Sequence, residues 1–262
     1  MSTLVLAHDA RRRNAFRLLV ASELKLALRY PVGIFVAFAI PLLLLVVFGS
    51  IPGTTRPVAA FGGISFFNLY VPTLLVFVLL ALGVGMLPQV LATYRQQGVL
   101  RRMSTTPVSP SWLLAAQLTV ALLLATISIA ILLGAGAGIF SLALPHDVGG
   151  YLVSLAALVL TAAAMLGLGL CAAALAGSPQ IAQAITALLF YPLAFFSGLY
   201  VPLSEIHSGL ITTISKVLPT GAGVNALHAA FTGHSPGAEP LLVLAGWALL
   251  TSLAAARLFR WE

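Results

Sequence analysis

The segment YRQQGVLRRMSTTPVSP, residues 94–110, decides how this chain is organised. It separates two apolar runs that are each long enough to cross a bilayer, which takes about 20 residues as a helix. Because it contains three arginines, it must lie in water or among lipid headgroups rather than in the hydrocarbon. These arginines are Arg95, Arg101 and Arg102.

The order of residues within this segment predicts a short amphipathic helix beneath the membrane. A polar turn begins at Tyr94, Gly98 follows it, and an apolar and basic turn covers 99–103. Thr106 and Pro107 then end the helix, since proline lacks a backbone N–H and clashes with the preceding turn. The alternative is a solvated loop that simply follows the rule that cytoplasmic loops are basic.

The whole chain has the composition of a polytopic membrane protein. Of its 262 residues, 60% are hydrophobic and 7% are charged, and the mean hydropathy is +1.08. Soluble enzymes lie far outside this range. The net charge of +7 comes from Lys and Arg at the edges of apolar runs, so it does not form the basic stripe of a nucleic-acid-binding surface. The single cysteine, Cys171, excludes a disulfide framework and a cysteine metal site.

Hydropathy predicts an all-α fold in which residues 1–262 form one domain with six transmembrane helices. The expected spans are about 32–50, 66–87, 111–140, 151–175, 181–200 and 241–258. Pro41 and Pro192 lie in the middle of the first and fifth spans and are expected to kink them, while Pro88 is expected to end the second. Small residues of the third span predict a surface for close helix packing. They are Gly134, Gly136 and Gly138.

Residues 1–30 are expected to form a cytoplasmic tail that ends in an interfacial helix over 13–30. Apolar side chains recur there with the period of a helix, and basic side chains face the other way. The residues expected to define this helix are Phe16, Arg17, Glu23, Lys25 and Arg29.

Glu23 is unusual within this helix because it follows Phe16 by seven residues and so falls in the middle of the apolar face. A buried carboxylate is costly unless it is paired or reaches water. One hypothesis is that it bonds an arginine of the segment 94–103 and links the two cytoplasmic elements. The other is that its side chain bends out to water at the edge of the helix.

A second informative segment follows the fifth apolar run. It begins with SGLYVPL at 197–203, continues as a moderately apolar stretch over 204–217, and ends in Leu218-Pro219. The stretch is too short and polar to span the membrane but too apolar to lie free in water, which predicts an external, re-entrant pair of short helices. The residues expected to mark this hairpin are Ser197, Gly198, Tyr200, Pro202 and Pro219.

The charge distribution predicts that both termini and the segment 94–110 are cytoplasmic. With six spans, only Arg56 and Lys216 fall on the opposite face. The basic residues on the cytoplasmic face are Arg11, Arg12, Arg13, Arg17, Lys25, Arg29, Arg95, Arg101, Arg102, Arg257 and Arg260.

The segment 94–110 resembles the cytoplasmic loop of ABC transporter permeases of the type-2 export class, which reads E-R-E-x-G-T-L-E-R-L-x-x-T-P. At the acidic positions of that pattern this chain has Tyr94, Gln96 and Arg101. The tail helix, the six spans and the SGLYVPL hairpin also fit the layout of the family, which includes the permeases for daunorubicin and other drugs. The positions that match the loop pattern are Arg95, Gly98, Leu100, Arg102, Thr106 and Pro107.

The resemblance implies that a separate ATPase subunit docks on this loop. The chain has no G-x-x-x-x-G-K-[ST] sequence, so it is expected to bind no ATP, to hold no cofactor or metal, and not to be an enzyme. ATP and Mg would bind two copies of the partner ATPase. A second permease copy, in a bacterial plasma membrane, would complete the transporter through spans one and five. The expected coupling residues are Tyr94, Arg95, Gly98, Leu100, Arg101, Arg102, Thr106 and Pro107.

The spans contain no Asp, Glu, Lys, Arg or His up to residue 256, which argues against an ion-coupled carrier and an intramembrane protease. A hydrophobic or amphipathic substrate, such as a drug, an antibiotic or a lipid, is therefore expected. Export of a polysaccharide or lipid-linked glycan, and a non-transporting membrane scaffold, are the alternatives. Aromatic residues are expected to line the substrate path or the dimer seam, unless they only face lipid. They are Phe35, Phe38, Tyr191, Phe195 and Phe196.

Overall fold

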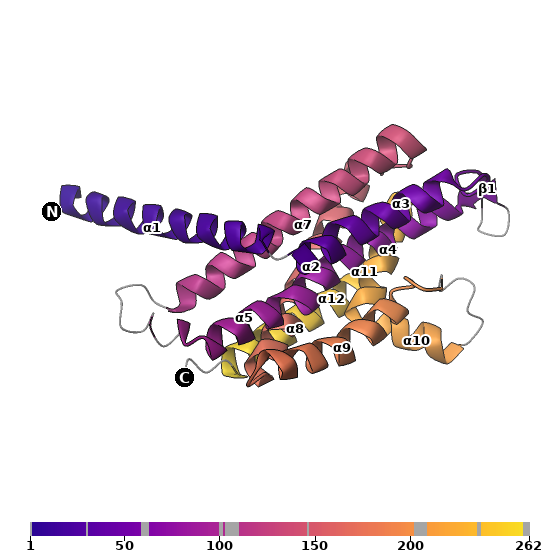
Figure 1. Cartoon of the computed structure of the whole chain (residues 1–262). Coiled ribbons are helices and arrows are strands. Elements are labelled where there is room, and N and C mark those ends of the chain that lie inside the picture. The colour runs from indigo at the N-terminus through magenta and orange to yellow at the C-terminus, as the bar shows by residue number, and fades with distance from the viewer. Residues whose placement is uncertain are drawn as a thin grey trace.

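The computed structural model describes residues 2–29, 31–58, 63–99, 102, 110–145, 147–201, 209–234 and 237–258. Figure 1 shows a bundle of long helices from which α1 (Ser2–Leu28) extends to one side. Six helical stretches in this described part are long and apolar enough to span a membrane, which confirms the predicted all-α polytopic class. They are Val32–Ser50, Phe66–Gln96, Ser111–Phe140, Val148–Leu175, Pro179–Phe196 and Glu239–Leu258.

Spans one and two are each built from three helical pieces, and the other spans are single α-helices. Span one comprises α2 (Pro31–Ile34), the π-helix η1 (Phe35–Ala39) and α3 (Ile40–Ser50). Span two comprises α4 (Phe66–Leu80), the π-helix η3 (Ala81–Met86) and α5 (Leu87–Gln96). The remaining spans lie in α7 (Pro110–Phe140), α8 (Val148–Leu175), α9 (Pro179–Phe196) and α12 (Glu239–Leu258). A short antiparallel pair, β1 (Pro57–Val58) and β2 (Ile64–Ser65), joins spans one and two.

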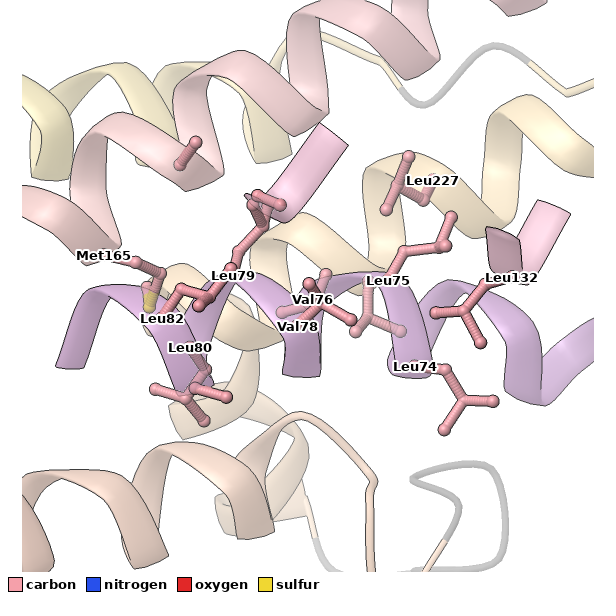
Figure 2. Packing of buried hydrophobic residues seen from close by; sticks show 14 of the residues in the cluster. Leu74, Leu75, Val76, Val78, Leu79, Leu80, Leu82, Leu132, Met165 and Leu227 are labelled. Carbon is pink, nitrogen blue, oxygen red and sulfur yellow. The ribbon is translucent and has the colours of Figure 1, made fainter. Parts of the chain in front are cut away.

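Span two forms the core of the bundle. Within its most apolar window 83% of the residues are buried, compared with 17% in spans one, five and six. Figure 2 shows the leucines of α4 and η3 surrounded by side chains of α7, α8 and α11 (Pro219–Phe231), namely Leu132, Met165 and Leu227. Spans one, five and six therefore keep broad apolar faces that this copy of the chain leaves uncovered.

The π-helices of spans one and two have the same relation to proline. Each is followed by a proline at the second residue of the next α-helix, Pro41 after η1 and Pro88 after η3. A proline lacks an N–H and crowds the carbonyl four residues earlier, and a π-turn widens the helix where this happens. The expectation that the second span ends before Pro88 is therefore wrong, because the helix passes this residue and continues to Gln96.

Side chains of other helices bond the carbonyls that these prolines release. Ser128 Oγ of α7 donates to Ala37 O at 2.9 Å, and Thr186 Oγ1 of α9 donates to Val84 O at 3.3 Å. A carbonyl without a hydrogen bond in the hydrocarbon would cost roughly several kcal/mol, because its hydrogen bond to water would be lost and not replaced. Helix α9, in contrast, runs through Pro192 as one α-helix.

Helices α8 and η3 cross with their backbones in contact. A Cβ atom added to Gly169 would lie 2.0 Å from Gly83 O, and one added to Gly83 would lie 2.7 Å from Met165 C. The glycines of span three do not play the packing role expected of them in this chain: a Cβ on Gly134 or Gly138 would meet nothing within 4 Å. Gly136 contacts Leu142, in the connection after α7, rather than another helix.

Two short helices follow span five, α10 (Gly209–Val217) and α11. Ser197 and Gly198 form the turn after α9, with Gly198 at φ +82°. Tyr70 Oη of α4 donates to Leu199 O at 2.6 Å and so fixes this turn to span two. Pro219 lies in the first turn of α11, and most of α11 is buried. Tyr200 is exposed, and Pro202 lies outside the described residues.

Candidate functional site

Helix α1 packs on the first half of α7 through one face. Phe16 meets Trp112 edge to face with ring centroids 5.9 Å apart, and Ala27 is buried further along the same face. Arg17, Lys25 and Arg29 are exposed, as the predicted polar face requires. The helix is longer than the predicted 13–30 because it begins at Ser2. Leu28, the last residue of the helix, is 60% exposed.

Glu23 is buried at the junction of α1, α5 and α7. Only 6% of its surface is exposed. Tyr94 Oη of α5 donates to Glu23 Oε2 at 2.5 Å, and Gln117 Nε2 of α7 donates to the same oxygen. We refer to Glu23, Tyr94 and Gln117 as the carboxylate node. It joins the tail helix to the helix that leads into the segment 94–110.

The carboxylate node replaces the expected pairing of Glu23 with an arginine. Arg95 Nη1 donates to Ala176 O at 3.0 Å, which ties the end of α5 to the turn between α8 and α9. Arg102 Nη2 donates to Gln97 O at 3.0 Å, within its own segment. The link between the two elements thus exists, but the phenol of Tyr94 makes it. The sequence contained one usable signal, since Gln117 is an isolated amide in the apolar start of span three.

Burial raises the pKa of the Glu23 carboxyl above its usual value, and the hydrogen bond from Tyr94 acts in the opposite direction. Desolvation, which disfavours the charged form, is the larger of the two effects. The carboxylate therefore lies in a place where a positive charge would lower the free energy of its ionised form.

The described part of the predicted coupling segment contains a sharp turn after α5. Gln97 ends the helix, and Gly98 has φ +66°, a conformation that favours glycine. Arg102 N then donates to Gly98 O at 3.0 Å, as in the first turn of a new helix. Leu100, Arg101, Thr106 and Pro107 lie outside the described residues.

One cavity lies beside the carboxylate node, and a second cavity adjoins the first. The first, of about 370 Å³, is lined by all three node residues together with Met86, Gln89 and Pro179 among others. The second, of about 310 Å³, lies between spans one, two and five and is lined by Val36, Gln183, Thr186, Phe190 and Tyr191 among others. Met86 and Gln89 line both cavities, so the two adjoin.

Of the aromatic residues expected along a substrate path, Tyr191 lines the second cavity, and the other four line neither of these two cavities. Phe35 is 61% exposed on the outer face of span one, and Phe38 is half-buried. Phe195 and Phe196 contact each other edge to face with centroids 5.3 Å apart, at the C-terminal end of α9, one turn beyond Tyr191. The polar amide and hydroxyl side chains of the second cavity, Gln89, Gln183 and Thr186, were not identified from the sequence.

Replacing Tyr94 with phenylalanine is expected to loosen α1. The change removes the donor 2.5 Å from a buried carboxylate, a bond to a charged group that contributes about 1.5–3 kcal/mol. Amide hydrogen exchange over residues 16–28 should accelerate by about tenfold or more, since each 1.4 kcal/mol is a factor of ten. The Tyr191→Phe variant, which changes an exposed tyrosine, is the control. Equal exchange in both variants would show that the node does not hold α1.

The comparison with known proteins agrees with this architecture. A family model described as ABC-2 type transporter matches residues 14–232, which include the second half of α1, spans one to five, and both short helices. A search of curated proteins found no match. The chain therefore belongs to the ABC-2 type transporter family and is the membrane-spanning permease subunit of an ABC transporter.

Proposed function

We propose that this permease exports hydrophobic or amphipathic compounds, of drug, antibiotic or lipid type, and that a separate ATPase subunit supplies the energy. The observation that carries the proposal is the pair of adjoining cavities, which extend from the carboxylate node to the exposed face of α9. Together they have the size and the largely apolar lining of a site for a drug-sized molecule. An ion-coupled carrier would need an ionisable group in the middle of the membrane, whereas the charged residues of the six spans lie at span ends, namely Arg95, Glu239 and Arg257.

The working transporter in this proposal contains two permeases and two ATPases. Spans one and five each leave large side chains exposed, including Phe35, Leu43, Leu188 and Tyr191. The second cavity opens between these same spans, so a second copy seated there would close it. In the dimer, these apolar faces would contact the second copy instead of lipid.

The proposed coupling route begins at the segment 94–110 beneath the membrane, with both termini in the cytoplasm. The basic residues gathered at that end favour this orientation. Arg95 connects the end of α5 to the turn before α9, and Tyr94 connects it to α1. A push from the ATPase, with ATP and Mg bound there, would therefore reach three parts of the bundle together. The π-helices before Pro41 and Pro88 are the proposed flexible points, at which spans one and two change between two states.

Purification of the permease with its ATPase, followed by transport into vesicles, tests this function. Tyr191→Ala is expected to lower export severalfold, because it removes the aromatic wall of the second cavity, while leaving ATPase binding unchanged. Leu155→Ala removes a 60% exposed side chain from α8, outside spans one and five, and should export normally. Full export by Tyr191→Ala would exclude the cavity as the path. If no ATPase binds the permease, ATP hydrolysis by a separate subunit is excluded as the energy source.

A further inference from the structure

The Glu23 carboxylate is exposed to the first cavity from its wall, and the described residues that line this cavity include no Lys, Arg or His. We propose that this cavity binds the cationic head of an amphipathic substrate, a protonated amine or a comparable organic cation, with Glu23 as the counter-ion. The inference rests on the proposed function, which gives the molecule a reason to enter, and it adds the charge class of the substrate.

The basic side chains near Glu23 that the structure describes are directed away from its carboxylate, so a bound cation could act as its counter-ion. On its own helix, Lys25 and Arg29 are exposed and point away from the buried face. On α5, Arg95 is directed to Ala176 O at the turn between α8 and α9. On α7, the group that faces Glu23 is the neutral amide of Gln117. A carboxylate in such a place is poorly compensated, and a bound cation would supply the missing charge.

The hydrogen bonds of the node also leave room for a ligand. Tyr94 and Gln117 both donate to Oε2 of Glu23, and no described residue donates to Oε1. An ammonium group carries three N–H donors and no acceptor, so it can bind the remaining oxygen. The Tyr94 ring lines the cavity as well, and an aromatic face attracts cations. The node thus offers a negative charge, a free acceptor and an aromatic ring at one place.

The apolar part of such a substrate fits the space beyond the node. Met86 and Gln89 lead from the first cavity to the second, where Val36, Phe190 and Tyr191 form apolar and aromatic walls. A molecule with a cation at one end and an apolar body at the other would place each part in matching surroundings. A neutral amphiphile would gain only the second of these contacts.

The site should respond to pH in a defined direction. Since burial raises the pKa of the Glu23 carboxyl, the negative charge is present above that raised value and is lost as the pH falls through it. Tyr94 is the other titratable side chain in the described lining, and it acts as a hydrogen-bond donor. Binding of a permanent cation, tetraphenylphosphonium, should therefore weaken as the pH falls, and the Glu23→Gln variant should lose this dependence.

Binding of two matched probes to the full permease in phosphatidylcholine nanodiscs tests the proposal. The probes are 1-pyrenebutylamine and 1-pyrenebutanol, which differ in an ammonium against a hydroxyl group. The native protein should bind the amine about tenfold or more tightly than the alcohol, the range of a charge-assisted contact. Glu23→Gln should lose this preference and still bind the alcohol. Glu239→Gln, the same change in an exposed residue at the start of α12, should keep it.

The outcomes separate this inference from the proposed function. Retained binding of the alcohol shows that Glu23→Gln is folded. Equal binding of the two probes by the native protein, or an equal loss of both in Glu23→Gln, would overturn the cation site. Export of neutral compounds with ATP would in that case still support the permease function, because it does not depend on Glu23.

Discussion

Most of the Gly169→Ala protein is expected not to fold. The added Cβ would lie 2.0 Å from the carbonyl oxygen of Gly83, in a helix crossing where backbone meets backbone. Neither side can move away by rotating a side chain, so α8 and η3 would have to separate. Insertion of one methyl into a packed interior costs about 1–3 kcal/mol, and a backbone collision of this kind belongs at or above the upper limit.

Gly134→Ala is the matched control for this prediction. Gly134 also lies inside a transmembrane helix, but a Cβ there would meet nothing within 4 Å. Alanine should be neutral at this position, or stabilising by about 0.5–1 kcal/mol through its higher helix propensity. Size-exclusion profiles and melting temperatures in one detergent would compare the variants. If Gly169→Ala and Gly134→Ala have the same melting temperature, the close crossing of α8 and η3 is wrong.

The crossing of α8 and η3 is a part of the fold that could not be predicted from the sequence. Six spans could be predicted because a run of about twenty apolar residues is typical of a transmembrane helix. Which glycines meet a neighbour could not, since a helix that is apolar on all sides does not reveal its inward face. The run of Gly134, Gly136 and Gly138 was conspicuous, yet the contact is made by Gly83 and Gly169.

The continuation of span two past Pro88 could not be predicted from the sequence for a related reason. Proline usually ends a helix, and Pro88 was expected to do so. The helix continues because a π-turn accommodates the ring and Thr186, about a hundred positions further along the chain, bonds the released carbonyl of Val84. No local pattern contains that compensation.

The site was predictable in part. The helical period alone placed Glu23 on the buried face of α1, and the cost of a buried carboxylate required a partner. The choice of an arginine followed from charge, but Tyr94 and Gln117 are the residues brought there by the crossing of α5 and α7. The pairing depends on the tertiary arrangement, which the periodicity of α1 does not contain.

Gly98→Pro is expected to uncouple ATP hydrolysis from export while the bundle remains folded. Gly98 has φ +66°, and proline fixes φ near −65°. The substitution also removes the N–H that donates to Arg95 O at 3.1 Å. It further disfavours the helical backbone of Gln97, which would then precede a proline. Three independent conflicts thus fall on the turn between α5 and the proposed docking segment.

Gly233→Pro is the matched control, because Gly233 has φ +72° in an exposed turn at the other end of the bundle. Both variants should keep the native elution profile, since a Cβ at either position would meet nothing within 4 Å. Substrate-stimulated ATPase activity in vesicles should fall about tenfold or more in Gly98→Pro, if the turn transmits more than about 1.4 kcal/mol of coupling. It should stay unchanged in Gly233→Pro. Equal activity in the two variants would mean that the ATPase does not act through the turn at Gly98, and the proposed route through α5 would have to be abandoned.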